Sequence, residues 1–408
     1  MSTSTEANLQ YPIDPLNSHV SWIFFALNSK PTSLRQVLGR RTGESEPVVI
    51  VENPVSVLRS RSIPNLKRRI EALSENAATW RYHPLHLPER IAGIAQIVRY
   101  WNRRLLQSEL DRLTPAASSR IVCYDSPSQH RLVGKLQEHI SIYLAVDDRT
   151  LTVQGEPIPG ELEAERKLLG KIDTVICVSE SLAETLRSRI PRDRKIPVHV
   201  LSNGYDERLF DPGRSWPEPQ ILSGIPKPRI LVTGHISERI DWDGIERAAR
   251  ARPEWVWFFV GPADQGIPRK IDSLDKRLKA DNCNRAGLFY CPPVPISEVP
   301  ALIVHCDVSA IPYRLNPFTL ASSPLKASES LAMGAPVLST RIPSLGKYGQ
   351  VIQWVEEGNG ESYAIALDNL SGKKNNPEEI EKRRAAVTGD TWAELLIKFR
   401  KMVFAEKQ

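Results

Sequence analysis

Two nearby stretches are the most informative about the fold, CDVSAIPY (residues 306–313) and SPLKASESLAMGAPV (residues 323–337). In the first, Val308–Ile311 is a short apolar run that is typical of a buried strand. In the second, the sequence predicts a helix over Leu325–Met333 and a further strand at Val337–Ser339. A strand, a helix and a strand in close succession are typical of a parallel sheet whose strands are connected by helices.

The same alternation extends over most of the chain. Strands are also predicted at Val20–Leu27, Pro47–Glu52, Arg120–Tyr124, Ser141–Val146, Thr174–Val178, Val198–Leu201, Arg229–Thr233, Trp255–Val260 and Val351–Trp354. Helices are predicted at Ile91–Leu113, Ser179–Arg189, Trp242–Ala251 and Ser297–His305, and a last helical stretch at Pro377–Phe404. The pattern therefore predicts two doubly wound α/β domains that face each other across a cleft.

The interruptions of this alternation set the expected domain boundaries. Residues 211–228 are rich in proline and lack apolar periodicity, which is typical of a linker. With 408 residues the chain is too long for one ordinary core. We expect a polar tail (1–17), a first domain (18–205), a linker (206–228), a second domain (229–375) and a C-terminal helical segment (376–408) that packs back on the first domain.

Composition excludes several classes of protein. Hydrophobic residues at 41% and charged residues at 25% are close to globular averages, so a disordered or fibrous chain is excluded. No apolar run reaches the roughly 20 residues that a membrane-spanning helix needs. The first 17 residues lack the features of a secretory signal, and the five cysteines include no C-x-x-C pair. We therefore expect a cytoplasmic protein with reduced thiols.

Metal and cofactor motifs are absent from the sequence. The eight histidines are scattered, and no P-loop, G-x-G-x-x-G or G-x-S-x-G motif occurs. We accordingly expect no metal and no cofactor.

A basic segment lies in the first half of the chain. Residues 59–104 contain ten basic and three acidic residues. Apolar residues Ile63, Leu66, Ile70 and Leu73 recur at helical spacing among arginines and lysines, which predicts a helix with one apolar stripe. Such a helix could rest on an anionic membrane surface, or its stripe could pack on the domain core. Nucleic-acid binding is not expected, because few aromatic residues are interleaved with the basic ones.

Paired carboxylates follow one predicted strand. Asp147 and Asp148 come directly after Ser141–Val146, at the end of the strand where ligands bind in such sheets. One carboxylate could act as a general base while its neighbour raises its pKa. The alternative is a turn or helix-capping role.

Two further loops follow predicted strands. Asn203 and Gly204 are predicted to form a tight turn with left-handed backbone geometry, and they either line the cleft or serve only as that turn. In GHISER (234–239), Gly234 would allow the backbone to approach a phosphate, and Arg239 would neutralise its charge.

The richest candidate site comprises the end of the first opening stretch, the polar loop that follows it and the predicted helix of the second stretch. Ser323 precedes Pro324, which favours a helix start, and free N–H groups there attract phosphate. Lys326 adds positive charge, and Glu329 could accept hydrogen bonds from a ribose diol. With Tyr313, these residues are candidates for binding a nucleotide sugar. The alternative is a surface Lys–Glu pair.

Taken together, these segments resemble the GT-B glycosyltransferases, in particular the retaining family 4 type. The resemblance rests on DTVICVS (173–179), VLSNGYDERLFDP (200–212), the two opening stretches and Thr391-Trp392. The first half is more similar to transferases of the teichuronic-acid type, which make bacterial surface polysaccharides. That similarity rests on WNRRLL (101–106), YLAVDD (143–148) and GHISERID (234–241).

The resemblance implies transfer of a sugar, hexosyl or glycuronosyl, from a nucleotide diphosphate sugar to a hydroxyl. From this resemblance we expect a UDP-sugar as the donor and a glycan or lipid-linked molecule as the acceptor. Asp147 matches the base of the inverting xanthan-type glucuronosyltransferases. Glu329 matches the second glutamate of the family's Glu-x(7)-Glu, whereas Ala321 stands at the first. The alternative is a catalytically silent GT-B protein that acts as a binding or scaffolding subunit.

Overall fold

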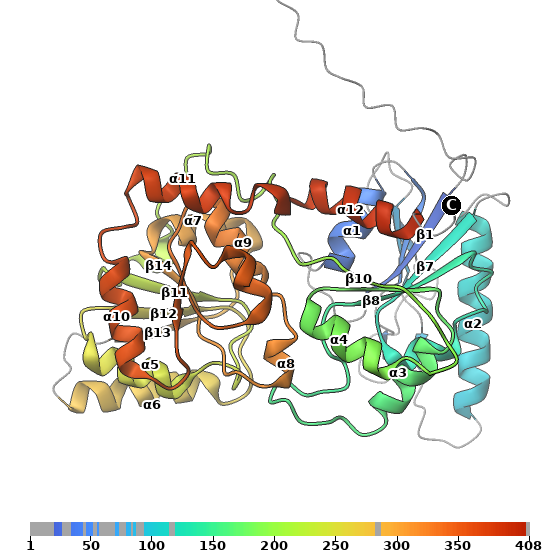
Figure 1. Cartoon of the computed structure of the whole chain (residues 1–408), viewed down its shortest axis with the longest axis horizontal. Coiled ribbons are helices and arrows are strands. Elements are labelled where there is room, and N and C mark those ends of the chain that lie inside the picture. The colour runs from blue at the N-terminus through green and yellow to red at the C-terminus, as the bar shows by residue number, and fades with distance from the viewer. Residues whose placement is uncertain are drawn as a thin grey trace, which may run out of the picture. The chain divides into compact units, whose positions relative to one another are not determined.

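Figure 1 shows the protein as a computed structural model. The structure describes residues 20–26, 34–43, 46–51, 55–56, 70–72, 79–82, 85–86, 94–113, 119–281 and 287–404. The chain forms two compact units, residues 1–144 with 171–173, and residues 145–170 with 174–408. The second unit includes residues that we assigned to the first domain, and two of them, Ser179 and Asn203, hydrogen-bond to residues 321 and 323. The predicted boundaries at 18–205 and 229–375 remain a prediction.

The strands of the first half form an eight-stranded sheet, in the order β10-β9-β8-β7-β1-β2-β5-β4. The strands are β1 (Val20–Phe25), β2 (Val48–Val51), β4 (Ile70–Ala72), β5 (Thr79–Tyr82), β7 (Ser119–Tyr124), β8 (Ile140–Ala145), β9 (Thr174–Cys177) and β10 (Val198–Val200). β1 pairs in parallel with β2 and β7, whereas β4 is antiparallel to β5. All residues of β1 and β2 are buried, as continuous apolar runs in a parallel sheet require.

Helices and short elements complete this half of the chain. They are α1 (Leu34–Thr42), α2 (Ile94–Leu113), η1 (Pro127–Arg131), α3 (Glu161–Leu169) and α4 (Glu180–Arg189), with β3 (Val55–Ser56) and β6 (Leu85–His86) forming a two-stranded parallel sheet. The predicted serine cap of α4 is confirmed, because the Ser179 hydroxyl accepts a hydrogen bond from the Leu182 N–H at 3.1 Å.

The predicted amphipathic helix at residues 63–73 is wrong at its only described part. Ile70–Ala72 forms strand β4, whose register against β5 places Ile70 opposite Tyr82. A strand alternates its side chains between two faces, so these residues do not continue a helical stripe. Ile63, Leu66 and Leu73 lie outside the described residues. Within the described part of the chain, no helix has the length and apolar character needed to cross a membrane.

The second sheet has six strands, all parallel, in the order β13-β12-β11-β14-β15-β16. They are β11 (Arg229–Thr233), β12 (Val256–Val260), β13 (Gly287–Cys291), β14 (Val308–Ile311), β15 (Val337–Thr340) and β16 (Ile352–Val355). Counted within this half of the chain, the order is 3-2-1-4-5-6, which is a doubly wound topology. The order reverses between β11 and β14, and this switch point is where such sheets bind ligands.

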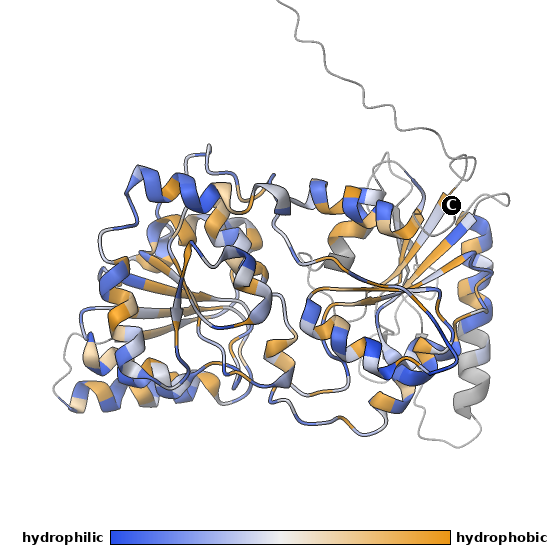
Figure 2. Cartoon of the chain, in the orientation of Figure 1, coloured by the Kyte–Doolittle hydropathy of each residue, from blue (hydrophilic) through white to orange (hydrophobic). Residues whose placement is uncertain are grey.

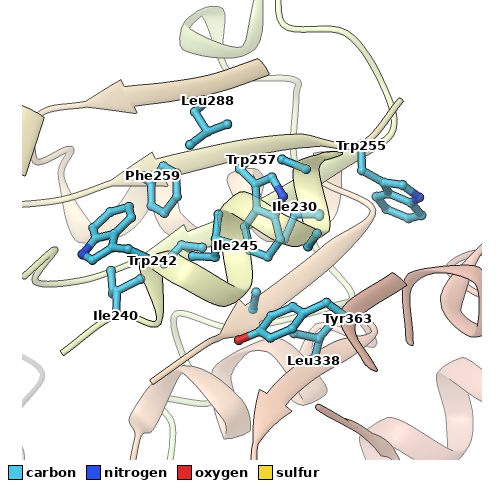
Figure 3. Close-up of a cluster of buried hydrophobic side chains, with 14 of the residues drawn as sticks. Ile230, Ile240, Trp242, Ile245, Trp255, Trp257, Phe259, Leu288, Leu338 and Tyr363 are labelled. Atoms are coloured by element: carbon cyan, nitrogen blue, oxygen red, sulfur yellow. The ribbon is translucent and has the colours of Figure 1, made fainter. Parts of the chain in front are cut away.

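Helices cover both faces of the second sheet (Figure 1). On one face, α5 (Trp242–Ala251), α6 (Ile267–Ala280) and α10 (Gly360–Leu370) close over a cluster of buried residues. Figure 2 shows hydrophobic strands beneath helices with hydrophilic outer sides. Figure 3 shows large side chains in the cluster, where Trp257 packs near Phe259 and Tyr363. On the other face lie α7 (Val299–His305) and α9 (Leu325–Ala332).

The predicted linker packs on this second face. Phe210, Leu222 and Ile225 are buried in one cluster with residues of β11, β12 and α7. The guanidinium of Arg229 donates to the backbone oxygens of Leu222 and Ile225, at 3.0 and 2.6 Å, which ties the segment to the start of β11.

The helical stretch predicted at residues 377–404 is divided into two helices. They are α11 (Pro377–Ala385) and α12 (Trp392–Phe404), with η5 (Thr388–Asp390) between them. The remaining short elements are η2 (Gln220–Leu222), η3 (Ile296–Glu298), α8 (Pro317–Leu320) and η4 (Pro343–Tyr348).

Candidate functional site

The first part of the site is the loop that follows β11. Gly234 has a φ of +96°, a backbone conformation that residues other than glycine rarely adopt. Its N–H donates to the Val260 carbonyl at 3.0 Å, and a Cβ at this position would lie 3.1 Å from Lys326 Nζ. Glycine therefore lets the backbone turn at the end of β11 while the lysine of α9 lies close against it.

The N-cap residue of α5, Asp241, fixes the position of this loop through its hydrogen bonds. Asp241 is buried, and its carboxylate accepts hydrogen bonds from the Gly244 N–H at 3.0 Å, the Gly358 N–H at 2.7 Å and the Tyr363 hydroxyl at 3.1 Å. The Asp241 N–H in turn donates to the Pro312 carbonyl at 2.8 Å. These bonds fix residues 234–241 against the segment that follows β14.

Two cations meet on the ring of Tyr313. The guanidinium of Arg239 lies 4.7 Å from the ring centroid, and Lys326 Nζ lies 5.3 Å from it. Both contacts fall in the range of cation–π attraction. Lys326 also donates a hydrogen bond to the Thr233 carbonyl at the end of β11. Burial lowers the pKa of Lys326, and the neighbouring Arg239 lowers it further.

Glu329 lies one turn along α9 from Lys326. Glu329 is only 8% exposed, which excludes the alternative of a surface Lys–Glu pair. Among the described residues, its carboxylate accepts no hydrogen bond. Burial raises the pKa of Glu329 to about 7, although the charge of Lys326 acts to lower it. An unpaired buried carboxylate is costly to the fold, and a ligand with two adjacent hydroxyls would satisfy it.

Ser323 and Asn203 form a contact at the start of α9. Asn203 donates from Nδ2 to the Ser323 carbonyl at 2.6 Å and from its backbone N–H to the Ser323 hydroxyl at 3.3 Å. Asn203 Oδ1 is buried without a hydrogen-bond partner. The structure thus places Asn203 beside one of the predicted nucleotide-sugar residues.

The predicted left-handed turn at Asn203 and Gly204 is wrong. Neither residue has a positive φ. Gly204 is needed for another reason, because a Cβ there would overlap the backbone oxygen of Asp390. The N–H of Tyr205 donates to that same oxygen at 3.0 Å, so Gly204 permits close backbone packing.

The two adjacent carboxylates after β8 have different surroundings. Asp148 is 3% exposed and accepts a bidentate pair of hydrogen bonds from Arg189, at 3.0 and 2.8 Å. It also accepts the N–H and the hydroxyl of Thr150, at 3.0 and 2.6 Å. Burial acts to raise the pKa of Asp148, but the hydrogen bonds from Arg189 and Thr150 hold it below its ordinary value. Asp148 therefore has the turn-forming role, while Asp147 is partly exposed.

Two features near the predicted residues were not predicted from the sequence. One is the pair of His235, which follows Gly234, and Asp264, whose Oδ1 lies 2.7 Å from His235 Nε2. The histidine in the GHISER motif was the sequence signal that could have indicated it. The Ser179 hydroxyl donates to the Ala321 carbonyl at 2.6 Å, so the position of the family's first glutamate is buried and engaged through its backbone. No sequence signal linked residues 179 and 321.

The structure brings five predicted residues together at the switch point of the second sheet. Two cations, an aromatic ring, a backbone turn and an unpaired carboxylate are contributed by Arg239, Lys326, Tyr313, Gly234 and Glu329. This set can bind a phosphate group and a diol at once. In the described part of the chain, no three His, Cys, Asp or Glu side chains gather as metal ligands.

Comparison with known proteins bears on both the fold and the site. No family model matches the chain. It is 27% identical over 303 residues to a Bacillus subtilis (strain 168) protein named provisionally as the teichuronic acid biosynthesis glycosyltransferase TuaH. The match covers 71% of this chain and 74% of that protein.

Solved structures match nearly the whole chain. Sucrose-phosphate synthase from Thermosynechococcus elongatus superposes with a TM-score of 0.69 at 13% identity, covering 94% of this chain and 98% of that one. A trehalose-6-phosphate structure from E. coli bound with UDP-2-fluoro glucose gives 0.69 at 10% identity, covering 94% and 99%. A glycosyltransferase from Rickettsia africae gives 0.62 at 13% identity, covering 95% and 98%. The chain therefore has the GT-B fold of two doubly wound Rossmann-like domains.

Proposed function

We propose that this chain is a glycosyltransferase that moves a sugar from a nucleotide diphosphate sugar to a hydroxyl acceptor. The observation that carries the proposal is the meeting of Arg239, Lys326 and Glu329 around Tyr313 at the switch point of the second sheet. The name of the Bacillus relative supports sugar transfer, and the UDP-sugar analogue in one structural neighbour favours a UDP-sugar as donor.

The two cations would stabilise the leaving nucleoside diphosphate. Negative charge grows on the phosphate oxygens as the glycosidic bond breaks, and preorganised positive groups favour that transition state. Arg239 and Lys326 are held in place by the Tyr313 ring and by backbone carbonyls, so they need little rearrangement. We therefore propose that the sugar transfer does not need a metal ion.

Glu329 would bind the ribose of the donor. Its carboxylate is buried, unpaired among the described residues, and one helical turn from Lys326. Hydrogen bonds from the two ribose hydroxyls would satisfy it, and the lysine would then lie on the phosphate side of the nucleotide.

Asp147 would deprotonate the acceptor hydroxyl if the transfer inverts the sugar. It follows β8, and its neighbour Asp148 is committed to Arg189 and Thr150. The choice of Asp147 follows the resemblance to the xanthan-type enzymes. A positioned base commonly contributes about 10²–10⁴-fold in rate.

The acceptor would be a glycan or lipid-linked intermediate of bacterial surface polysaccharide synthesis, a proposal that rests on the name of the Bacillus relative. The ten basic residues of segment 59–104 would favour an anionic membrane surface. Co-sedimentation with anionic and neutral vesicles tests this. Binding that needs anionic lipid and fades with salt supports it, and absence of binding at low salt contradicts it.

The decisive experiment is a screen of nucleotide sugars. Isothermal calorimetry with UDP, GDP and ADP identifies the base, and release of nucleoside diphosphate from the matching sugars in the presence of acceptor measures transfer. Lys326→Ala should weaken nucleotide binding. Lys276→Ala, which removes an exposed lysine paired with Asp272 on α6, should not.

The screen also separates the proposal from its alternative. Ala321 in place of the family's first glutamate favours a silent binding subunit, and its carbonyl is occupied by Ser179. Binding of a nucleotide without sugar transfer would favour that alternative. Absence of nucleotide binding would contradict both.

A further inference from the structure

A buried ion network lies at the end of β8. Arg189, near the end of α4, donates from Nη1 to Asp148 Oδ1 at 3.0 Å and from Nη2 to Oδ2 at 2.8 Å. Nη1 also donates to Oε2 of Glu165 on α3 at 2.6 Å. The side chains of Asp148 and Glu165 are 3% and 1% exposed, and that of Arg189 is 14% exposed. One guanidinium therefore joins two helices and the loop after β8.

The network fixes the backbone next to Asp147. Asp148 accepts the N–H and hydroxyl of Thr150, and its carbonyl accepts the Leu151 N–H at 3.3 Å. Asp147 thus lies between the end of β8 and a residue whose carboxylate is held on both oxygens. Packing apolar side chains between α3 and α4 would join the helices without burying three charges, but it would not hold this loop.

We infer that Arg189 is a positioning residue, which acts through Asp148 to hold Asp147 where it can accept a proton from the acceptor. The inference rests on the proposed function, in which Asp147 is the base. A catalytic group displaced by about 1 Å can lose about 10²-fold in rate. The planar guanidinium is suited to this task, because it binds both carboxylate oxygens at once, whereas lysine offers one point charge.

The test is Arg189→Lys, alone and combined with Asp147→Asn. Arg189→Lys should lower kcat by about tenfold to hundredfold, while the KM for the nucleotide sugar stays within about twofold. In the Asp147→Asn background the lysine should have no further effect on kcat, because the group that it misplaces is gone. Arg187→Lys is the matched control, since Arg187 lies on the same helix and pairs with Glu180 in solvent.

The outcomes separate this inference from the proposed function. If Arg189→Lys lowers kcat equally in both backgrounds, the positioning role is overturned and sugar transfer stands. If the unaltered protein transfers no sugar, the proposed function fails. In that case, hydrogen exchange still tests whether the contact between Arg189 and Asp148 holds the loop. Arg189→Lys should speed amide exchange in residues 147–152 without changing exchange in α9, and unchanged exchange in the loop would overturn the inference.

Discussion

Asp148, in the loop after β8, and Glu329, on α9, are both buried carboxylates, yet their hydrogen bonding is opposite. Asp148 receives hydrogen bonds from Arg189 and Thr150, which hold its pKa below the ordinary value against the effect of burial. Glu329 receives none from the described residues, and burial raises its pKa to about 7.

This is the difference expected between a carboxylate that stabilises the fold and one that binds a ligand, which is the role we propose for Glu329. Buried polar groups are almost always hydrogen-bonded, and exceptions with a perturbed pKa gather at functional sites. Both oxygens of Asp148 already accept hydrogen bonds from Arg189 or Thr150. Glu329 accepts no hydrogen bond from the described residues, and it lies one helical turn from the half-buried Lys326.

The sharpest test of this comparison is the pair Asp147→Asn and Asp148→Asn. Asp147→Asn should lower kcat by about 10²–10⁴-fold with nearly unchanged nucleotide binding, because it removes the proposed base. Asp148→Asn should lower kcat less, since it only loosens the loop. Steady-state kinetics with donor and acceptor measure both. A larger loss for Asp148→Asn would mean that the wrong member of the pair was assigned.

The folding role of the Asp148 network predicts a large effect on stability. Arg189→Met leaves two buried carboxylates without their cation and should lower the free energy of unfolding by about 3–5 kcal/mol. Urea denaturation measures this loss. Arg187→Met removes an exposed ion pair from the same helix, so a change within about 0.5 kcal/mol is expected. Equal losses in the free energy of unfolding for the two variants would contradict the folding role of the Asp148 network.

The ligand role of Glu329 predicts a smaller loss, in binding. Glu329→Ala should weaken binding of the free nucleoside diphosphate by about 1–3 kcal/mol, the cost of losing hydrogen bonds to a charged group. Calorimetry measures it, with Glu361→Ala as control, because Glu361 is exposed at the start of α10. Unchanged affinity in Glu329→Ala would remove Glu329 from the nucleotide site.

The smallest expected effect is a stability gain that depends on pH. The folded-state pKa of Glu329 is about 7 and the ordinary value is 4.5, so stability present below about pH 4.5 is lost as pH rises through about 7. Glu329→Gln cannot ionise. Its Tm should match the unaltered protein near pH 5 and exceed it by a few degrees at pH 8. A difference that is equal at both pH values would contradict the raised pKa.

The sequence predicted five of the six strands of the second sheet, because those strands are short apolar runs, but it did not predict β13. The predicted and observed bounds agree for β11, α5 and β14. Strand ends then placed Arg239 and Lys326 at one edge, as the structure has them. Helix α6 was not predicted, although its buried apolar residues recur at helical spacing, at Ile267, Ile271, Leu274 and Leu278.

The surroundings of the carboxylates could not be predicted from the sequence. Arg189 is 41 residues from Asp148, and no local pattern indicates which oxygen atoms its guanidinium reaches. The stacking of two cations on Tyr313 likewise depends on how the loop after β11 lies against the segment after β14. Spacing along the chain predicts which residues share a sheet edge, whereas pairing across helices depends on packing.

The backbone bonds around Tyr205 have a consequence for how this protein tolerates change during evolution. The Tyr205 N–H donates to the Asp390 carbonyl and its own carbonyl accepts the Trp392 N–H, both at 3.0 Å. Every residue except proline carries both main-chain groups, so substitutions other than proline at Tyr205 or Asp390 keep the groups that make these two hydrogen bonds. Gly204 and the length of the chain before Trp392 are the inherited constraints. A truncated chain that ends before Asp390 would leave both polar groups of Tyr205 unpaired, whatever its side chains.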